Sequence, residues 1–290
     1  MSKAWFVTGT DTEVGKTAVS CALLRAAARA GKRTAAIKPV AAGCDADGRN
    51  EDALQLMAAM TAELDYARVN PVALQAAVAP HIAAAEEGRN LRVGHLAGLC
   101  RGVMLGESDF LLIEGAGGWR VPLNARETLA DLARELQLGV ILVVGMRLGC
   151  INHALLSAEA VRRDGLRLAG WVANQPGTPM ARHAENLDTL GQLLGAPLLD
   201  VRVPHRFLVQ AVPALPLLFL EGHDVVVEDQ LVNPFRGRVV GRQDTGPLPF
   251  RASDPRDVGF VFGSLDLAVA AQADQLADPQ YLRRPRLAPG

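Results

Sequence analysis

The amino-acid sequence predicts an α/β fold in which a doubly wound, mainly parallel sheet carries helices on both faces. Short apolar runs rich in β-branched residues alternate with Ala- and Leu-rich stretches of helical character over residues 1–203. The run Val140-Ile141-Leu142-Val143-Val144 has no polar position, which is typical of a strand buried on both faces. Because helices connect such strands as right-handed crossovers, functional groups are expected at the carboxyl ends of the strands.

The alternation predicts the secondary-structure elements in chain order. Strands are expected at residues 4–8, 34–39, 110–114, 140–145, 168–174 and 197–201, where the apolar runs lie. Helices are expected between them, at residues 17–30, 51–61, 91–105, 127–137, 152–164 and 180–194.

The loop after the first strand has the composition of a phosphate-binding site. Residues 9–17 read Gly-Thr-Asp-Thr-Glu-Val-Gly-Lys-Thr and lead into a helical stretch, an order that predicts a P-loop NTPase type of fold. The loop N–H groups and the helix N-terminus would face one phosphate chain. Lys16 is expected to neutralise the β- and γ-phosphates, and the Thr17 hydroxyl to ligate Mg²⁺. Five residues separate Gly9 from Gly15, one more than in the general pattern.

Lys38 closes the second predicted strand and precedes Pro39. Its ammonium is expected in the crevice above the sheet, where it would offset charge developing on a transferred phosphoryl group. The alternative is an ordinary surface lysine. Asp52 stands where the next helix begins, and it is either a Mg²⁺ ligand or an acid favoured there by the helix dipole.

Glu114 closes the third predicted strand, before the glycine turn Gly115-Ala116-Gly117-Gly118. With Thr17 and Asp52 it completes a candidate Mg²⁺ site, the alternative being a capping or ion-paired acid. Two carboxylates and a hydroxyl suffice, because Mg²⁺ prefers oxygen ligands and usually retains waters and nucleotide oxygens.

The fourth and fifth strands are also followed by polar groups. Residues 149–153 open a helix, so their amides could bind an anion such as a carboxylate, or Asn152 could be an ordinary N-cap. Asn174 closes the fifth strand, where it could contact a base edge or lie in an exposed turn before Pro176.

Composition excludes several function classes. A formal net charge of -1 gives no reason to expect nucleic acid or an anionic membrane as partner. The four cysteines are scattered without metal-ligand spacing, which predicts free thiols in a reducing cytoplasm. No signal peptide or membrane span is expected. A cytoplasmic location follows.

The sequence changes character after residue 203, where prolines become frequent and the alternation of strands and helices stops. Residues 204–290 are therefore assigned to a C-terminal extension that is expected to be poorly ordered. A genuine extension, a small second domain and a shifted reading frame that runs past the normal stop all stay open. The proline, arginine and glycine content without periodicity favours the last.

Several motifs in order resemble the dethiobiotin synthetase family, the ATP-dependent ring-closing enzymes of biotin synthesis. The resemblance covers residues 3 to about 200 and includes the longer loop spacing. The matching segments are residues 6–17, Lys38-Pro39-Val40, Val69-Asn70-Pro71, Pro80-His81, residues 114–118, residues 148–154 and residues 170–174.

The resemblance implies a homodimer that uses ATP, Mg²⁺, CO₂ and 7,8-diaminononanoate. A carbamate on one amine attacks the γ-phosphate, and the second amine displaces phosphate from the resulting carbamic–phosphoric anhydride to close the ring. Lys16 and Lys38 are the implied catalytic residues. The implied nucleotide site contains Glu13, Val14, Gly15, Lys16, Thr17, Ala18, Asp52, Glu114, Gly115, Ala116, Gly117, Asn174, Gln175, Pro204 and His205. The implied substrate site contains Thr12, Ala42 and Gly118, and, from the partner subunit, Gly149, Cys150, Ile151 and Asn152.

The sequence departs from the family at three contact positions and at its end. Ala42 replaces a usual serine, Ala76-Ala77 replaces a usual Glu-Pro pair, and Arg147 replaces a common lysine. Three other functions stay open. One is a partitioning-type P-loop ATPase, although Asp11 stands where those proteins carry a signature lysine. The second is a related amide-forming ligase, and the third is a family member that its altered C-terminus has inactivated.

Overall fold

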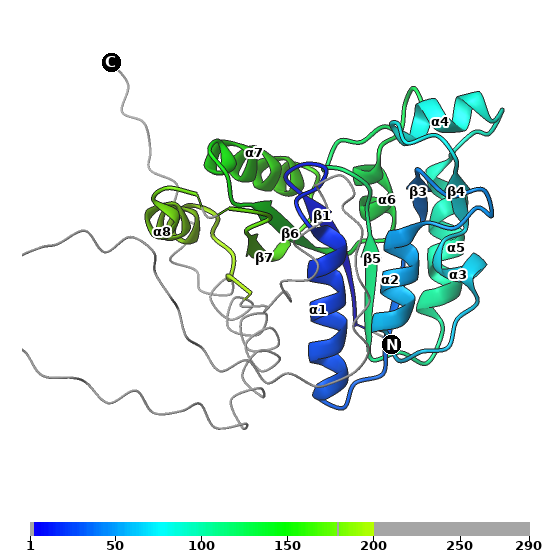
Figure 1. Ribbon diagram of the computed structural model, residues 1–290, viewed down its shortest axis with the longest axis horizontal. Helices are drawn as coiled ribbons and strands as arrows, with labels where there is room; N and C mark the ends of the chain where they lie inside the picture. Colours follow the sequence, from blue (N-terminus) through cyan, green and yellow to red (C-terminus); the bar gives the residue numbers. More distant parts are fainter. Residues whose placement is uncertain (1–2, 179, 200–290) are drawn as a thin grey trace, which may run out of the picture. The chain divides into compact units, whose positions relative to one another are not determined.

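The computed structural model describes residues 3–178 and 180–199 of the chain (Figure 1). Its main sheet has five parallel strands, in the spatial order β2 (Thr34–Ile37), β5 (Phe110–Glu114), β1 (Lys3–Gly9), β6 (Gly139–Gly145) and β7 (Leu168–Asn174). β1 is central, with Val7 in register with Glu114 of β5 and Gly9 in register with Val143 of β6. The mainly parallel sheet expected from the apolar runs is therefore confirmed.

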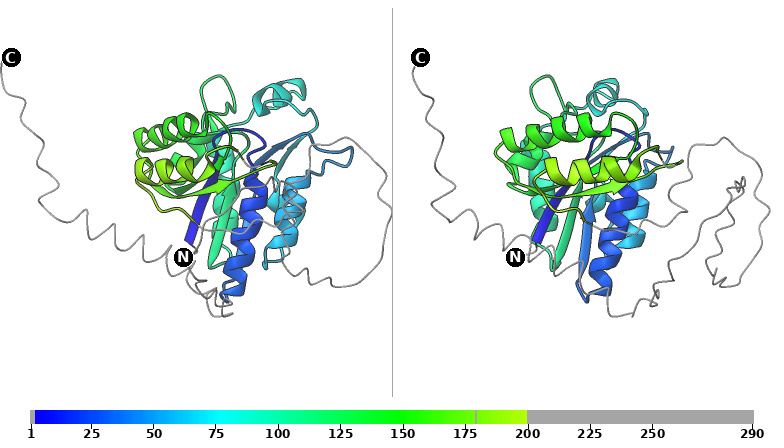
Figure 2. Two further views of the ribbon diagram at one scale, coloured as in Figure 1. Left: turned by 60° about the vertical axis from the view of Figure 1, so that its left-hand side comes forward. Right: turned by 90° about the vertical axis from the view of Figure 1, so that its left-hand side faces the viewer.

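Helices cover both faces of this sheet. Trp5 and Val7 of β1 pack with residues of α1 (Lys16–Arg29) and α2 (Glu51–Ala59), which lie against each other. Phe6, between them in sequence, packs into the opposite core, because side chains alternate along a strand. That second core is built on α5 (Val93–Met104), α6 (Leu129–Glu135), α7 (Cys150–Arg163) and α8 (His183–Leu193). Figure 2 shows α7 and α8 side by side on this face.

A second, two-stranded parallel sheet was not predicted. It pairs β3 (Val40–Ala42) with β4 (Val72–Leu74), and the short helices α3 (Tyr66–Val69) and α4 (Pro80–Glu86) accompany it. Strands of three residues are too short to show a period, and only pairing between distant segments defines them. The predicted strand at 34–39 ends at Ile37, and the chain resumes as β3 after Pro39.

Of the strand predicted at 197–201, the described residues 197–199 form only an isolated bridge, and residues 200–201 lie outside the described residues. Leu198 makes a single parallel bridge with Trp171 of β7, through Trp171 N–H to Pro197 O at 3.0 Å and Leu199 N–H to Trp171 O at 2.8 Å. A proline has no N–H to extend the ladder in the N-terminal direction. The predicted extension, with Pro204 and His205, lies outside the described residues. Among the described helices, none is long and apolar enough to cross a membrane.

Candidate active site

The phosphate loop leaves β1 at Gly9 and enters α1 at Lys16. Thr10 fixes its first half, because its N–H donates to Val143 O at 2.9 Å and its hydroxyl accepts from Gly145 N–H at 3.3 Å. Gly15 is the N-cap of α1 with φ 82°, in the left-handed region. A Cβ at Gly9 would lie 2.6 Å from Val14 Cγ2, so the tight turn requires glycine at this position.

Lys16 is buried at the first position of α1, where the loop ends. Its Nζ donates to the Asp11 carbonyl at 3.0 Å, so the side chain lies folded back over the loop. Burial lowers the pKa of Lys16 to about 8, against the attraction of Glu114. The ammonium is held where an anionic ligand would be attracted to it.

A buried charge cluster lies beside the loop, at the carboxyl ends of β2 and β5. Lys38 Nζ contacts Glu114 Oε1 at 2.9 Å and Asp52 Oδ2 at 2.6 Å. The Thr17 hydroxyl donates to the same Glu114 oxygen at 2.7 Å. Glu114 is fully buried and the Lys38 side chain is 5% exposed, whereas the Asp52 side chain is 44% exposed. The structure therefore brings together four of the five residues proposed from the sequence for charge stabilisation and metal binding, and the fifth, Lys16, bonds to the loop instead.

Neighbouring polar side chains hold this cluster in place. Asn70 Nδ2 donates to the Lys38 carbonyl at 2.8 Å, which fixes the backbone where β2 ends. Asn50 caps α2, and its side-chain oxygen accepts from Ala53 N–H at 3.4 Å, so Asp52 lies in the first turn. Asp52 thus has both features considered for it, a helix N-terminal position and a place in the cluster. Asn70 belongs to the segment Val69-Asn70-Pro71, which resembles the family, but no role was predicted for its side chain.

The ionisation of the cluster follows from its geometry. Burial alone would lower the pKa of Lys38, but Glu114 and Asp52 outweigh it and raise that pKa above its usual value. Partial burial opposes ionisation of Asp52, but Lys38, followed by Thr17 and Lys16, holds its pKa below the usual value. The cluster therefore carries a lysine cation against at least one carboxylate anion.

The oxygen atoms beside the loop suit a hard cation such as Mg²⁺. Glu114 Oε2 is buried without a hydrogen-bond partner among the described residues, and an unpaired buried carboxylate oxygen is a strong acceptor. The Thr17 hydroxyl and the half-exposed Asp52 carboxylate complete an all-oxygen set. The described part of the chain contains no group of three or more His, Cys, Asp or Glu side chains that could hold a metal alone. A cation here would need further oxygens from a ligand or water.

The glycine turn after β5 lies against the phosphate loop. A Cβ at Gly118 would be 3.5 Å from Gly9 O, and one at Gly117, where φ is 62°, would be 3.6 Å from the Thr12 hydroxyl. Of the predicted substrate residues, Thr12 therefore lies beside Gly117, and Gly118, the next residue in the turn, lies beside the start of the loop. Ala42 ends β3, and its carbonyl accepts from Asn50 Nδ2 at 3.4 Å.

The structure of the segment between β6 and α7 excludes one of the two interpretations of it, namely that Asn152 is the N-cap of the helix. Gly149, with φ 95°, is the N-cap of α7, and Asn152 lies exposed in the first turn, so Asn152 is not the cap. A glycine takes the cap position because the left-handed backbone favours it. Arg147, just before this segment, forms an ion pair with Asp11 of the phosphate loop. In the sequence, Arg147 was recognisable only as a replacement for a common lysine, and its contact with Asp11 was not predicted.

Asn174 and Gln175 lie at the end of β7. Asn174 is buried and its Nδ2 donates to the Val14 carbonyl at 2.8 Å, so the exposed-turn reading is wrong. Gln175 Nε2 donates to the Met146 carbonyl at 2.9 Å and to the Thr178 carbonyl at 3.0 Å. Glu13, Val14 and Ala18 belong to the loop and the first turn of α1. Contact of any of these residues with a base stays a prediction.

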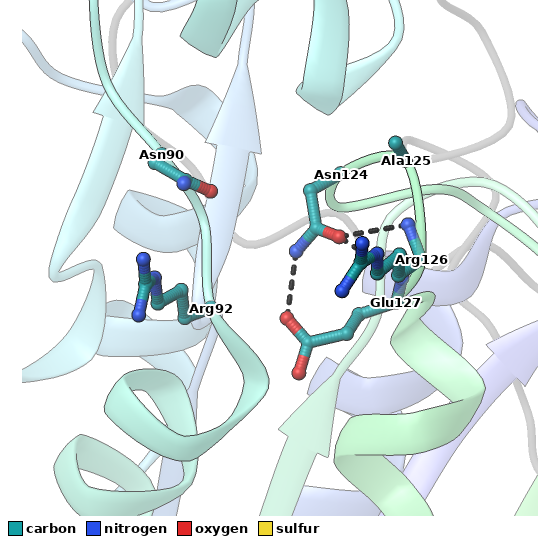
Figure 3. Close-up of a pocket in the computed structure, with 6 residues that line it drawn as sticks. All are labelled: Asn90, Arg92, Asn124, Ala125, Arg126 and Glu127. Carbon is teal, nitrogen blue, oxygen red and sulfur yellow. Dashed lines mark hydrogen bonds between the residues drawn. The ribbon is translucent and has the colours of Figure 1, made fainter.

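A polar surface cleft lies apart from these residues (Figure 3). Asn124 lines this cleft, and its Nδ2 donates to Leu91 O and to Glu127 Oε2, both at 2.6 Å. Glu127 Oε2 also accepts from Val93 N–H at the start of α5, at 3.3 Å. The carboxylate of the chain itself therefore occupies the anion position at that helix N-terminus. These contacts join the loop before α6 to the loop before α5.

Comparisons with known proteins place the chain in a family. Residues 3–212 match the family model described as an AAA domain. An ATP-dependent dethiobiotin synthetase of Marinobacter nauticus is 57% identical, over 68% of this chain and 86% of its own length. The enzyme of the same name from Cellvibrio japonicus is 56% identical over 72% and 92%. ATP-dependent dethiobiotin synthetase 1 of Escherichia coli O157:H7 is 52% identical over 69% and 89%. With a buried Lys38–Glu114 pair beside its phosphate loop, this chain belongs to the family of ATP-dependent dethiobiotin synthetases.

Proposed function

We propose that the chain catalyses the ATP- and Mg²⁺-dependent carboxylation and ring closure of 7,8-diaminononanoate to dethiobiotin, ADP and phosphate, in the cytoplasm. The single observation that best supports this is the position of Lys38, held between Asp52 and Glu114 at the edge of the phosphate loop. A fixed ammonium at that point can stabilise charge on a phosphoryl group during its transfer. Four free cysteines agree with a reducing compartment.

The proposed reaction has three parts. One amine adds to CO₂ and loses a proton to give a carbamate, whose oxygen attacks the γ-phosphorus and displaces ADP. The second amine then attacks the carbonyl carbon of the mixed anhydride and loses a proton, and phosphate leaves as the five-membered ring closes. No step needs a covalent bond to the protein, so positioning by Lys16, Lys38 and the loop N–H groups accounts for catalysis.

Thr17, Asp52 and Glu114 would hold Mg²⁺. When bound, the ion would neutralise the negative charge of the β- and γ-phosphate oxygens. The unpaired Glu114 Oε2 and the Thr17 hydroxyl support this assignment on chemical grounds. For the substrate, Thr12, Ala42 and Gly118 would line the diamine site, and residues 149–152 of a second subunit would bind its carboxylate. The segment just before α7 supports a homodimer of this kind, because Leu148 is 95% exposed there.

Phosphate release tests the proposal. Release is expected only when diaminononanoate, bicarbonate, Mg²⁺ and ATP are present together. Release with ATP alone would favour a partitioning-type ATPase, and no release under any combination would indicate an inactive family member. Lys16→Ala is expected to abolish turnover, and Lys32→Ala, at an exposed lysine outside the loop, is expected to leave it unchanged.

A further inference from the structure

Asn174 joins the last strand of the sheet to the phosphate loop. The residue is 3% exposed, and its Nδ2 donates to the carbonyl oxygen of Val14 at 2.8 Å. The two residues are 160 positions apart in the sequence, so this bond connects the end of β7 with the residue before the N-cap of α1. A buried carbonyl that lost this partner would be costly to leave unpaired.

Gly15 and Asn174 fit each other closely. A Cβ on Gly15 would lie 2.2 Å from Asn174 Nδ2, closer than any side chain can tolerate, and Gly15 also has a left-handed backbone. The amide of Asn174 therefore occupies the space that glycine leaves open. The same Nδ2 atom therefore bonds to the Val14 carbonyl and fills the space beside Gly15.

The opposite end of the loop is fixed by a different strand. Thr10 bonds to the backbone of β6 through Val143 and Gly145, and a Cβ on Gly145 would lie 2.7 Å from Val14 Cγ1. The loop is thus attached to β6 at its start and to β7 at its end. The attachment to β7 is made by a buried side chain outside the loop, that of Asn174.

We propose that Asn174 is a positioning residue for the phosphate loop, besides any contact with a nucleotide base. In a trans peptide unit the C=O and the following N–H point in opposite directions. Asn174 holds the Val14 carbonyl and therefore fixes the direction of the Gly15 N–H, one of the donors that a phosphate loop presents to its ligand. The inference rests on the proposed function only in that the loop must bind a triphosphate.

Inorganic tripolyphosphate separates this role from base recognition, because it has the phosphates of ATP and no base. Binding of ATP and of tripolyphosphate, each with Mg²⁺, is measured by titration calorimetry on the full chain. Asn174→Ala is expected to weaken binding of both ligands by about ten-fold. The matched control is Asn124→Ala, which removes another side-chain amide, one that donates to Leu91 O. It is expected to change neither affinity by more than about two-fold.

The outcomes distinguish the two assignments. If Asn174→Ala loses affinity for ATP but binds tripolyphosphate like the unaltered chain, Asn174 acts only on the base and the inference is overturned. If the unaltered chain binds neither ligand, the proposed function fails and the inference fails with it. Circular dichroism checks the fold of each variant. Should Asn174→Ala be unfolded, Asn174→Asp decides instead, because it keeps the side-chain size and replaces the amide donor by an acceptor.

Discussion

Replacing Lys38 by methionine tests whether the stability of the protein depends on the ion pair between Lys38 and the buried Glu114. Lys38 contacts two carboxylates that differ in exposure, since Glu114 is fully buried and the Asp52 side chain is 44% exposed. Solvent screens the Asp52 pair, which contributes about 0–1 kcal/mol to stability. Removing the cation from the buried Glu114 leaves an uncompensated charge, at a cost of about 3–5 kcal/mol. Methionine fills a similar volume, so cavity formation adds little.

The expected loss of unfolding free energy for Lys38→Met is therefore about 3–5 kcal/mol, nearly all of it from Glu114. Adding Glu114→Gln neutralises the stranded charge, so the double variant is expected to recover about 2–3 kcal/mol of that loss. Both variants are expected to lose phosphate release, because the ammonium itself is absent in each. The double variant would thus be more stable than Lys38→Met and would still release no phosphate.

Urea unfolding in EDTA, without nucleotide, measures these changes. Lys32→Met is the matched control at an exposed lysine, and it is expected to stay within about 0.5 kcal/mol of the unaltered chain. If the Lys38→Met and Glu114→Gln effects simply add, within about 0.5 kcal/mol, the two side chains are not coupled and the reasoning is refuted.

Two further predictions concern helix capping and thiols. Thr128 and Asp131 form a capping box on α6; partial burial would raise the pKa of Asp131, but the Thr128 hydrogen bonds and Arg134 together lower it. Asp131→Ala is expected to cost about 1 kcal/mol in urea unfolding. That contribution is full above the unfolded pKa near 4 and disappears as pH falls through the lower folded pKa, so an equal loss at pH 2 and pH 7 would contradict it. Burial raises the pKa of Cys21 and of Cys100 to about 12. Iodoacetamide at pH 8 is expected to spare both thiols in native protein and to label them in urea, as measured by mass spectrometry.

The parts of the site that could be predicted from the sequence are the residues that lie at the carboxyl ends of strands. Lys38 and Glu114 close apolar runs, and parallel strands bring their carboxyl ends to one edge of the sheet, so their proximity follows from the pattern. The phosphate loop was predictable for the same reason, because one short segment contains its strand, its glycines and its helix.

Other parts depend on contacts between distant segments, which no local pattern encodes. Asp52 meets Lys38 only because α2 packs beside α1, and the bond from Asn174 to Val14 requires β7 to lie in its place in the sheet. β3 and β4 exist only because they pair with each other, and each is too short to show an alternation of polar and apolar residues. Arg147 gave no signal of its pairing with Asp11, because an exposed arginine in a loop is common.

The bond between Thr17 and Glu114 has a consequence for how nucleotide binding arises along the chain. The two residues lie 97 positions apart, and they meet only after β5 has paired with β1. A growing polypeptide that has completed only its first strand and helix therefore contains the loop motif but lacks the acid and the second lysine beside it. Because a ligand that binds only the assembled form stabilises that form, nucleotide would favour the folded state by mass action. Full affinity for the triphosphate therefore requires that β5 has paired with β1. Fragments that end before β5 are expected to lack this affinity.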